Sequence, residues 1–277
     1  MISFDYLAAP GQLGNQMFKY AALRGIAENN GYDFYVPPSK LYLEKNKQLN
    51  KAYRKIFKYE YQNHFLFEYF EMNSFPRKNI KYSKFTKQVS PESHLFDENL
   101  FNNCPDNVQL TGYYQSPKYF QNIEEIIRND FKFKKHIVNK AKNLHFKYTF
   151  DCSMHIRRGD YLTNPNHHAL SMKYYNQAID IFGQDSNFLV FTDDIEWFKS
   201  TKFYRKGQFN LISTLTKNST ILDLYFMSLC NRHIIANSTF SWWGAWLSGS
   251  NKIIYPINWF KDGRSSSDIA CSSWIGI

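Results

Sequence analysis

The sequence predicts an α/β fold made of two doubly wound units, each built on a parallel sheet. Three observations carry this prediction. The first 36 residues have the pattern strand, turn, helix, strand. Residues 150–255 alternate apolar strand segments with helical segments, which is typical of a parallel sheet. A chain of 277 residues can hold one large domain or two of modest size, so its length allows two units.

The first unit begins with an apolar strand at residues 2–9, followed by a turn at 11–15. Residues 16–29 are predicted to form a helix that ends before Gly31, because glycine accepts the left-handed conformation common at helix C-termini. A second strand follows at residues 33–36. One face of this helix carries mostly small side chains, which favours close packing against the sheet: Phe18, Ala22, Gly25 and Ile26.

The alternation breaks at residues 40–105, which are rich in lysine and in aromatic residues. It resumes with a strand at 108–113 and a capped helix at 116–129. We expect most aromatic side chains of the irregular segment to pack in the core, and a few to line a groove in which they stack on a ligand. The series includes Tyr53, Phe57, Tyr59, Tyr61, Phe65, Phe67, Tyr69 and Phe70.

The second unit has the clearer pattern, and we place the boundary between the domains (1–148 and 149–277) near residue 148. Strands are predicted at 150–156, 188–192, 209–212, 234–236 and 252–255, with helices near 171–182 and 219–229. The helix at 171–182 carries a single apolar stripe formed by Met172, Tyr175, Ile179 and Phe182.

The composition excludes several classes of protein. No apolar stretch reaches the roughly 18–20 residues that span a bilayer, and the N-terminus lacks the pattern of a signal peptide, so we expect a cytoplasmic protein. The four cysteines fit no zinc or disulfide spacing and are expected to be reduced thiols. The net charge of +10 lies mostly in the first half. It could face an anionic membrane surface or glycan carrier, or be a solvated surface; no nucleic-acid-binding motif accompanies it.

Charged residues follow the predicted strand 150–156 directly. Arg157, Arg158 and Asp160 stand where a parallel strand ends, which is the edge of an open α/β sheet where ligands bind. The planar fork of arginine fits phosphate oxygens, so the pair indicates a diphosphate site. The alternative is a surface cluster of salt bridges.

Four blocks in this order resemble one family: residues 11–18, 155–161, 191–194 and 237–246. Together they resemble the α-1,2-fucosyltransferases of glycosyltransferase family 11, inverting enzymes that use GDP-fucose. The resemblance extends to about residue 256 and is weak through 40–105. It implies the GT-B architecture, in which two Rossmann-type domains face a central cleft.

The resemblance also implies the partners. The C-terminal domain would bind GDP-fucose, and the N-terminal domain would lie on the acceptor side. The acceptor would be a galactose-containing oligosaccharide or lipid-linked glycan, fucosylated on the 2-hydroxyl of galactose. Members of the family need no metal or other cofactor. Nucleic acid is not an expected partner, and association with a membrane would be peripheral at most, at its inner face.

The donor site is predicted from the ends of three strands. Arg157 and Arg158 would stabilise the departing β-phosphate, and a loop entering a helix after the strand 234–236 would offer amides and a helix dipole to a phosphate. Ser238 or Thr239 could equally cap that helix, and Trp242, Trp243 and Trp246 are predicted to pack in the core. The predicted donor-binding residues are His155, Arg157, Arg158, Asp193, Asp194, Asn237, Ser238, Thr239, Phe240 and Ser241.

Asp193 and Asp194 have three interpretations. A carboxylate can accept hydrogen bonds from N1–H and the 2-amino group of guanine together, and the resemblance implies that one of these aspartates, with His155, contacts the base. We favour Asp193 for this role. The alternatives are a metal-binding aspartate pair and, for Asp194, the N-cap of the next helix.

The remaining predicted catalytic residues are Asn15 and Gln16, which the resemblance places in the active cleft, and Asp160. Asp160 is either the general base or a brace for the arginines; neighbouring positive charges make it a weaker proton acceptor, which favours the brace. His167 and His168 are alternative bases, and a reaction in which the phosphate takes the proton needs none of them. Asp223 also fits the family pattern and could orient its neighbours.

Two rivals to a fucosyltransferase stay open at this point. One is another nucleotide-sugar transferase, of which a metal-dependent form would lose activity with a chelator. The other is a noncatalytic protein that binds a glycan or nucleic acid and has no affinity for GDP.

Overall fold

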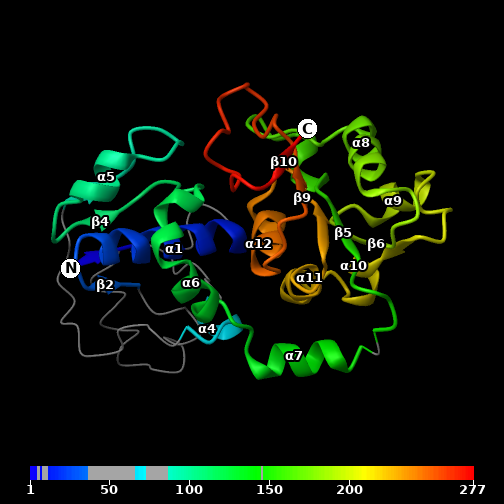
Figure 1. The fold of residues 1–277 in the computed structure, drawn as a ribbon, viewed down its shortest axis with the longest axis horizontal. Coiled ribbons are helices and arrows are strands. Elements are labelled where there is room, and N and C mark those ends of the chain that lie inside the picture. Colours follow the sequence, from blue (N-terminus) through cyan, green and yellow to red (C-terminus); the bar gives the residue numbers. More distant parts are fainter. Residues whose placement is uncertain (5–6, 8–11, 37–65, 73–86, 145) are drawn as a thin grey trace. The chain divides into compact units, whose positions relative to one another are not determined.

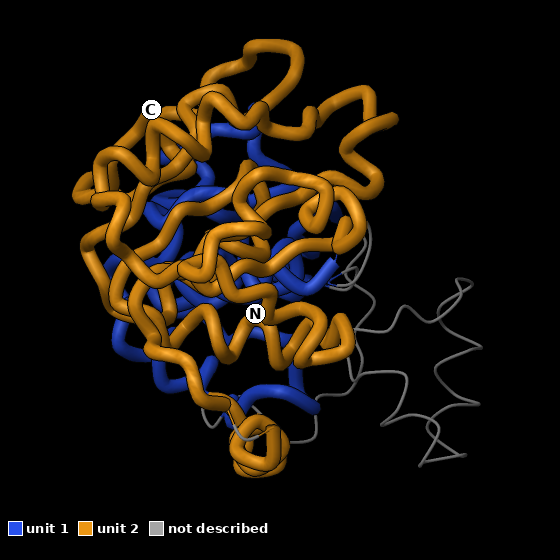
Figure 2. Tube along the Cα trace, turned by 90° about the vertical axis from the view of Figure 1, so that its right-hand side faces the viewer, with its two compact units in different colours: residues 1–132 blue, residues 133–277 orange. Residues whose placement is uncertain are grey.

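The computed structural model describes residues 1–4, 7, 12–36, 66–72, 87–144 and 146–277. The described chain forms two compact units, Met1–Lys132 and Phe133–Ile277 (Figure 2). The predicted boundary near residue 148 falls inside the second unit. Helix α7 (Lys135–Lys142) explains this position, since it packs against α11 (Thr220–Met227) of the same unit.

The first unit has a four-stranded parallel sheet in the order β2-β1-β4-β3. Its strands are short: β1 (Ile2–Ser3), β2 (Phe34–Tyr35), β3 (Gln88–Val89) and β4 (Gln109–Leu110). Phe4 and Phe34 project to the face that α1 covers, where Tyr20 meets the Phe34 ring with 6.3 Å between ring centroids. The strand–helix–strand opening predicted from the sequence is therefore confirmed.

Helix α1 (Leu13–Asn29) is the central element of the first unit, and residues 16–27 are all buried. It begins three residues earlier than predicted, so the expected turn at 11–15 is partly helical. Gly31, at φ +66°, ends it as predicted. The small face was expected to pack on the sheet, but Gly25 instead packs on Tyr119, whose carbonyl oxygen would lie 1.8 Å from an added Cβ.

The predicted helix at 116–129 is wrong in its first half. Ser116 caps a 3₁₀ turn η1 (Pro117–Tyr119), a second turn η2 (Gln121–Ile123) follows, and only then does α6 (Glu124–Asp130) begin. At the junction Phe120 leaves the helical conformation, with φ −143° and ψ 9°. The break lets Tyr119 and Phe120, neighbours in the chain, both be fully buried.

The described part of the first unit also has two short helices, α4 (Leu66–Tyr69) and α5 (Glu98–Asn103). Of the aromatic series, Phe70 is fully buried, and Phe67 and Tyr69 are partly buried. The other five members, Tyr53, Phe57, Tyr59, Tyr61 and Phe65, lie outside the described residues.

The second unit has a six-stranded parallel sheet in the order β10-β9-β8-β5-β6-β7 (Figure 1). The strands are β5 (Cys152–Ile156), β6 (Phe188–Thr192), β7 (Phe209–Leu211), β8 (Arg232–Ile234), β9 (Ile253–Tyr255) and β10 (Ile275–Gly276). Each of the five predicted strands is found, although β8 lies two residues before its predicted position, and β10 is a sixth strand that was not predicted. Its ladder pairs Arg232–Ile234 with residues 152–154 of β5 and then ends.

Helices flank this sheet as the alternation predicted. They are α8 (Met172–Phe182), α9 (Ile195–Ser200), α10 (Ile212–Leu215), α11 and α12 (Thr239–Leu247), with a 3₁₀ turn η3 at Gly159–Leu162. The predicted stripe of α8 packs into the main core, with Tyr175 and Ile179 buried. The tryptophans 242, 243 and 246 of α12 are buried against one another, so their packing role is confirmed.

Three thiols, those of Cys104, Cys152 and Cys230, are buried and free. Among the helices that the structure describes, none combines the length and the apolar character needed to cross a membrane.

Candidate active site

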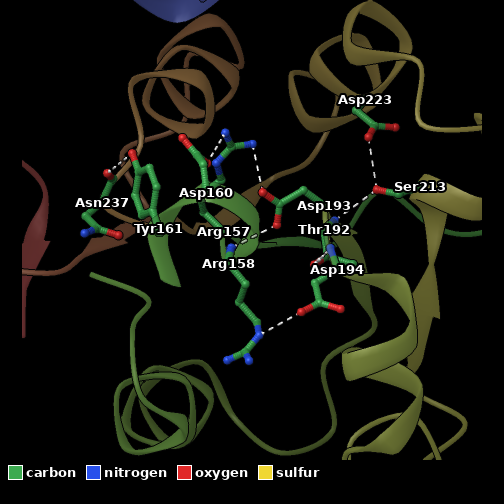
Figure 3. Close-up of polar contacts among 10 residues, drawn as sticks. All are labelled: Arg157, Arg158, Asp160, Tyr161, Thr192, Asp193, Asp194, Ser213, Asp223 and Asn237. Carbon is green, nitrogen blue, oxygen red and sulfur yellow. Dashed lines mark hydrogen bonds and ion pairs between the residues drawn. The ribbon is translucent and has the colours of Figure 1, made fainter. Parts of the chain in front are cut away.

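Polar side chains converge at the carboxyl ends of β5, β6 and β8, which are neighbours in the second sheet (Figure 3). The register pairs Ile156 with Thr192, so Arg157 and Asp193 are the first residues beyond their strands and lie side by side. The sheet therefore brings together two motifs that are about 35 residues apart in the chain.

Arg157 is held by two carboxylates. Its Nη2 lies 2.7 Å from Asp160 Oδ1, and its Nη1 lies 2.9 Å from Asp193 Oδ2. The guanidinium also lies 5.4 Å from the centroid of the Tyr161 ring. These contacts fix the direction of the planar fork, which is the part of arginine that binds phosphate oxygens in pairs.

Arg158 is oriented differently. Its Nε donates to Asp194 Oδ2 at 3.1 Å, and its guanidinium stacks over Trp197 of α9, 4.0 Å from the ring centroid. Its backbone N–H donates to Asp193 Oδ1 at 2.9 Å. Only glycine fits next to this contact, because a Cβ on Gly159 would lie 2.7 Å from Asp193 Oδ2.

Both aspartates of the pair thus have protein partners. Asp193 contacts Arg157 and the backbone of Arg158, whereas Asp194 contacts Arg158 and accepts from the backbone N–H of Trp197 at 3.1 Å. Asp194 is therefore the N-cap of α9, which was one of the three interpretations of this residue. The side chain of Asp193 stays 24% exposed, so it can still meet a ligand.

His155 lies on β5, two residues before Arg157, and its ring contacts that of Phe240 at 5.6 Å between centroids. Burial, followed by the charge of Arg157, lowers the pKa of His155 to about 3, so the ring is neutral at physiological pH. Its Nδ1 has no hydrogen-bond partner among the described residues. A buried ring nitrogen left in this way can accept from, or donate to, a bound group.

The loop between β8 and α12 borders the same edge. Asn237 is fully buried and donates to the carbonyl oxygens of His168 and Trp259, while its Oδ1 has no partner within the described chain. Ser238 precedes α12 without a side-chain capping bond. The hydroxyl of Ser241 instead donates to main-chain oxygens of its own loop, at 3.2 and 3.4 Å. Thr239 and Phe240, both partly buried, form the first turn of α12.

A buried hydrogen-bond chain supports the end of β6. The backbone N–H of Thr192 donates to Ser213 Oγ, which itself donates to Asp223 Oδ2, each at 3.0 Å (Figure 3). Thr216 Oγ1 donates to the other oxygen of Asp223. Burial raises the pKa of Asp223 to about 6 despite the two hydroxyl donors. Its contacts agree with the orienting role that the sequence suggested.

The candidate bases lie on one side of the arginines. Asp160 is the most exposed carboxylate of the cluster, at 56%, and its Oδ1 contacts Arg157. The His167 ring stacks on Tyr161 with 4.8 Å between centroids, and burial lowers its pKa. His168 approaches through its carbonyl oxygen. Asp160 thus has the geometry of a brace, while His167 has that of a packed ring.

Three residues of this cluster were missed from the sequence. Tyr161 donates to the carbonyl oxygen of Asn237 at 3.1 Å and so joins the loop after β5 to the loop after β8. Trp197 and Ser213 act through Arg158 and Thr192. Tyr161 could have been found because it adjoins the arginine motif, whereas nothing in the sequence marks Trp197 or Ser213.

Asn15 and Gln16 belong to the first unit and are described there. Both lie in the first turn of α1, and Asn15 Oδ1 accepts from Gln115 Nε2 at 2.9 Å. Gln16 is 5% exposed, and its Oε1 has no partner among the described residues.

Residues 4–277 match the family model described as Glycosyl transferase family 11. An Escherichia coli protein named alpha-1,2-colitosyltransferase is 33% identical over 288 residues, which cover 96% of each chain. The Escherichia coli O-antigen biosynthesis glycosyltransferase WbnK is 30% identical over 98% of this chain and 100% of its own length. The bovine galactoside alpha-(1,2)-fucosyltransferase 2 is 24% identical over 88% of this chain and 69% of its own.

Among solved structures, the fucosyltransferase NodZ from Bradyrhizobium aligns with a TM-score of 0.53 at 13% identity. The alignment covers 97% of this chain and 98% of NodZ. It supports the GT-B-like α/β fold expected from the sequence. Because the family model spans nearly the whole chain, and two relatives of 30% identity or more align almost from end to end, the chain belongs to glycosyltransferase family 11.

Proposed function

We propose that this protein is an inverting galactoside α-1,2-fucosyltransferase that moves L-fucose from GDP-fucose to the 2-hydroxyl of a galactose residue on a glycan. The observation that carries the proposal is the arrangement of Arg157, fixed between Asp160 and Asp193 at the end of β5. An arginine held in this way is suited to the growing charge of a departing β-phosphate. The names of the mammalian relatives support the choice of donor and linkage.

In the proposed reaction the acceptor oxygen attacks C1 of fucose from the face opposite the phosphate. The bond between C1 and the β-phosphate oxygen breaks, and GDP leaves with the electron pair. Arg157 and Arg158, with backbone amides at the start of α12, stabilise the diphosphate. Asp193, His155 and the loop 237–241 surround the nucleotide, and the acceptor proton passes to a base or to the phosphate itself.

We propose that transfer needs no metal. The support is the pairing of both aspartates: Asp193 contacts Arg157, and Asp194 contacts Arg158. Carboxylates neutralised by arginine are poor candidates for a metal-binding pair, since a cation would have to displace the guanidinium groups. Full turnover in excess EDTA, unchanged by added Mg²⁺ or Mn²⁺, is the expected result; loss of turnover that Mn²⁺ restores would contradict it.

A second donor has specific support, because the colitosyltransferase is 33% identical over nearly the full length. Colitose is fucose without its 3-hydroxyl, so both donors present the same GDP group to the arginines. The two candidate functions therefore differ only in how the sugar ring is recognised.

The deciding experiment incubates the purified protein with GDP-fucose, GDP-colitose, GDP-mannose and UDP-galactose, each with lactose and a panel of other galactosides. Products are identified by mass spectrometry, and the linkage by NMR. We expect a fucosylated galactoside with an α-1,2 linkage. Transfer of colitose alone would favour the second donor. Transfer from UDP-galactose, or no transfer together with no GDP affinity, would overturn the proposal.

A further inference from the structure

A second cluster of polar and aromatic side chains lies at the carboxyl edge of the first sheet. It is formed by the first two turns of α1 and by the segment after β4. Its members are Asn15, Gln16, Lys19, Tyr113 and Gln115. The site proposed above for the donor diphosphate uses none of these side chains.

The backbone after β4 presents two tyrosines in opposite ways. Gly112 turns the chain at φ +93°. Tyr114 then points inward, where it is 1% exposed and packs edge-on against Phe4. Tyr113 stays 41% exposed, one of few large aromatic side chains of the described surface with such exposure. An exposed ring beside a buried one is a platform that a ligand can cover.

Lys19 supports this platform from below. Its Nζ lies 5.5 Å from the centroid of the Tyr113 ring and 5.6 Å from that of Phe4, so the ammonium lies between the two rings. The residue is 1% exposed. Burial of a lysine costs free energy, and here the ammonium lies within cation–π distance of both rings.

Two amides stand next to the platform. Gln115 Nε2 donates to Asn15 Oδ1 at 2.9 Å, and this bond leaves Asn15 Nδ2 and Gln115 Oε1 without partners among the described residues. Gln16 adds a buried Oε1 that is likewise unpaired within the described chain. Because Asn15, Gln16 and Lys19 are spaced by three and four residues, they share one side of α1.

Paired amides next to an aromatic ring match the chemistry of a neutral, hydroxyl-rich ring. The apolar face of a galactose stacks on an aromatic side chain, while each hydroxyl both donates and accepts, as an amide pair does. The planar fork of arginine is the side chain that best binds a phosphate in pairs of hydrogen bonds, and the cluster contains no arginine.

We propose that Tyr113, with the Gln115–Asn15 amide pair and Lys19 behind it, binds the galactose ring of the acceptor. The ring stacks on Tyr113, and the amides hold its hydroxyls. This inference rests on the proposed function for the identity of the acceptor. It adds Tyr113 and Gln115 as residues that recognise the acceptor, and Lys19 as a residue that positions Tyr113.

The test separates acceptor from donor. Wild-type protein is first assayed for transfer from GDP-fucose to lactose, and absence of transfer would contradict the proposed function. Lactose binding, measured separately by ligand-observed NMR, then tests the inference independently of turnover. In Tyr113→Ala we expect the KM for lactose to rise about tenfold or more. The KM for GDP-fucose and the acceptor-independent hydrolysis of GDP-fucose should change less than about twofold.

Conservative and distant variants serve as controls. Tyr113→Phe keeps the ring and should restore lactose KM to within about twofold of wild type. Gln115→Leu should raise the KM for lactose about tenfold through loss of hydrogen bonds. Tyr204→Ala and Gln121→Leu remove an exposed tyrosine and an exposed glutamine elsewhere, and should change neither KM. Circular dichroism checks that each variant is folded.

Unchanged lactose KM and NMR binding in both Tyr113→Ala and Gln115→Leu would overturn the inference. A rise in the KM for GDP-fucose with unchanged lactose KM would also overturn it, because the cluster would then recognise the donor sugar.

Discussion

The two sheets of this protein end in clusters of opposite character. At the carboxyl edge of the second sheet, two arginines and three aspartates pair with one another, and each of these five charges has a named partner. At the same edge of the first sheet, the cluster is formed by amides and aromatic rings around a single buried lysine. The architecture is shared, but the chemistry at its edge is not.

Under the two proposals above, the difference between the clusters follows from the charge of the ligand proposed for each edge. A diphosphate brings negative charge that must be met by fixed, oriented cations, and arginines braced by carboxylates are already in place before the ligand arrives. A neutral sugar ring gains nothing from such a network and would have to compete with its salt bridges. Stacking and weak hydrogen bonds suit it better.

The largest expected effect comes from the arginine held by two carboxylates. Arg157→Lys keeps the charge and loses the fork, so the stabilisation of the leaving phosphate weakens in the transition state. We expect kcat to fall at least about a hundredfold, in line with arginines at phosphoryl centres. GDP affinity, measured by calorimetry, should fall less. Turnover close to that of wild type would show that Arg157 does not stabilise the leaving group. The proposed difference in function between the two sheet edges would then lose its main support.

A smaller effect is expected from the aspartate pair. Asp193→Asn turns a carboxylate that contacts both arginines into a neutral amide, and Asp194→Asn weakens the brace on Arg158. Charge-assisted hydrogen bonds are worth about 1.5–3 kcal/mol, so GDP affinity should drop roughly ten- to hundredfold.

Calorimetry on both aspartate variants measures the change in GDP affinity. Lactose binding by NMR is the matched control on the first unit, and the affinity for lactose should stay unchanged. Unchanged GDP affinity in both variants would end the role of the pair, including contact of Asp193 with the guanine base.

Asp160 has two possible roles that can be distinguished by experiment: it either holds Arg157 in position or acts as the general base. As a brace it shares Arg157 with Asp193, so Asp160→Asn should lower turnover and GDP affinity together, each about tenfold. A general base contributes about 10²–10⁴-fold to turnover alone.

The value of kcat and the GDP affinity must both be measured on one preparation of Asp160→Asn. A large loss of kcat with unchanged GDP affinity would make Asp160 the base. An alanine variant of His167 or His168 that flattens the acidic limb of the pH–rate profile would instead assign that role to the histidine.

The smallest effect concerns stability at low pH. Burial lowers the pKa of His155 and His233 to about 3, so both are neutral in the folded second unit. Between that value and the ordinary value of 6.5 the unfolded chain binds more protons, and the stabilisation, complete above pH 6.5, is lost as the pH falls towards 3. Each histidine contributes a slope of at most about 1.4 kcal/mol per pH unit.

The measurement can be restricted to one unit, since all six tryptophans lie in residues 133–277. Urea unfolding followed by tryptophan fluorescence between pH 4.5 and 7.5 should show the loss. His233→Asn, which keeps a polar group between Ser153 and Ser248, should reduce the slope by about 1 kcal/mol per pH unit. An equal slope in the variant would show that His233 is protonated without cost.

Much of the second unit was predictable because its signals are local. Strands β5 and β6 are fully buried in the sheet, and both fall within their predicted ranges. The stripe of α8 and the glycine at the end of α1 are also local patterns. Predictions failed where neighbours in space override the local pattern, as at 116–129, where Tyr119 and Phe120 are both buried and a continuous helix is interrupted.

The residues of the candidate donor site were predictable from the sequence to a similar extent. The sequence alone determined that this chain carries arginine and aspartate motifs after apolar strands, because residue type and strand end can both be read locally. Only the tertiary structure decided which arginine meets which aspartate, through the parallel register that sets Ile156 opposite Thr192. It also decided that Trp197, Ser213 and Gln115 belong to the two clusters, since a contact between distant segments has no signature in either segment by itself.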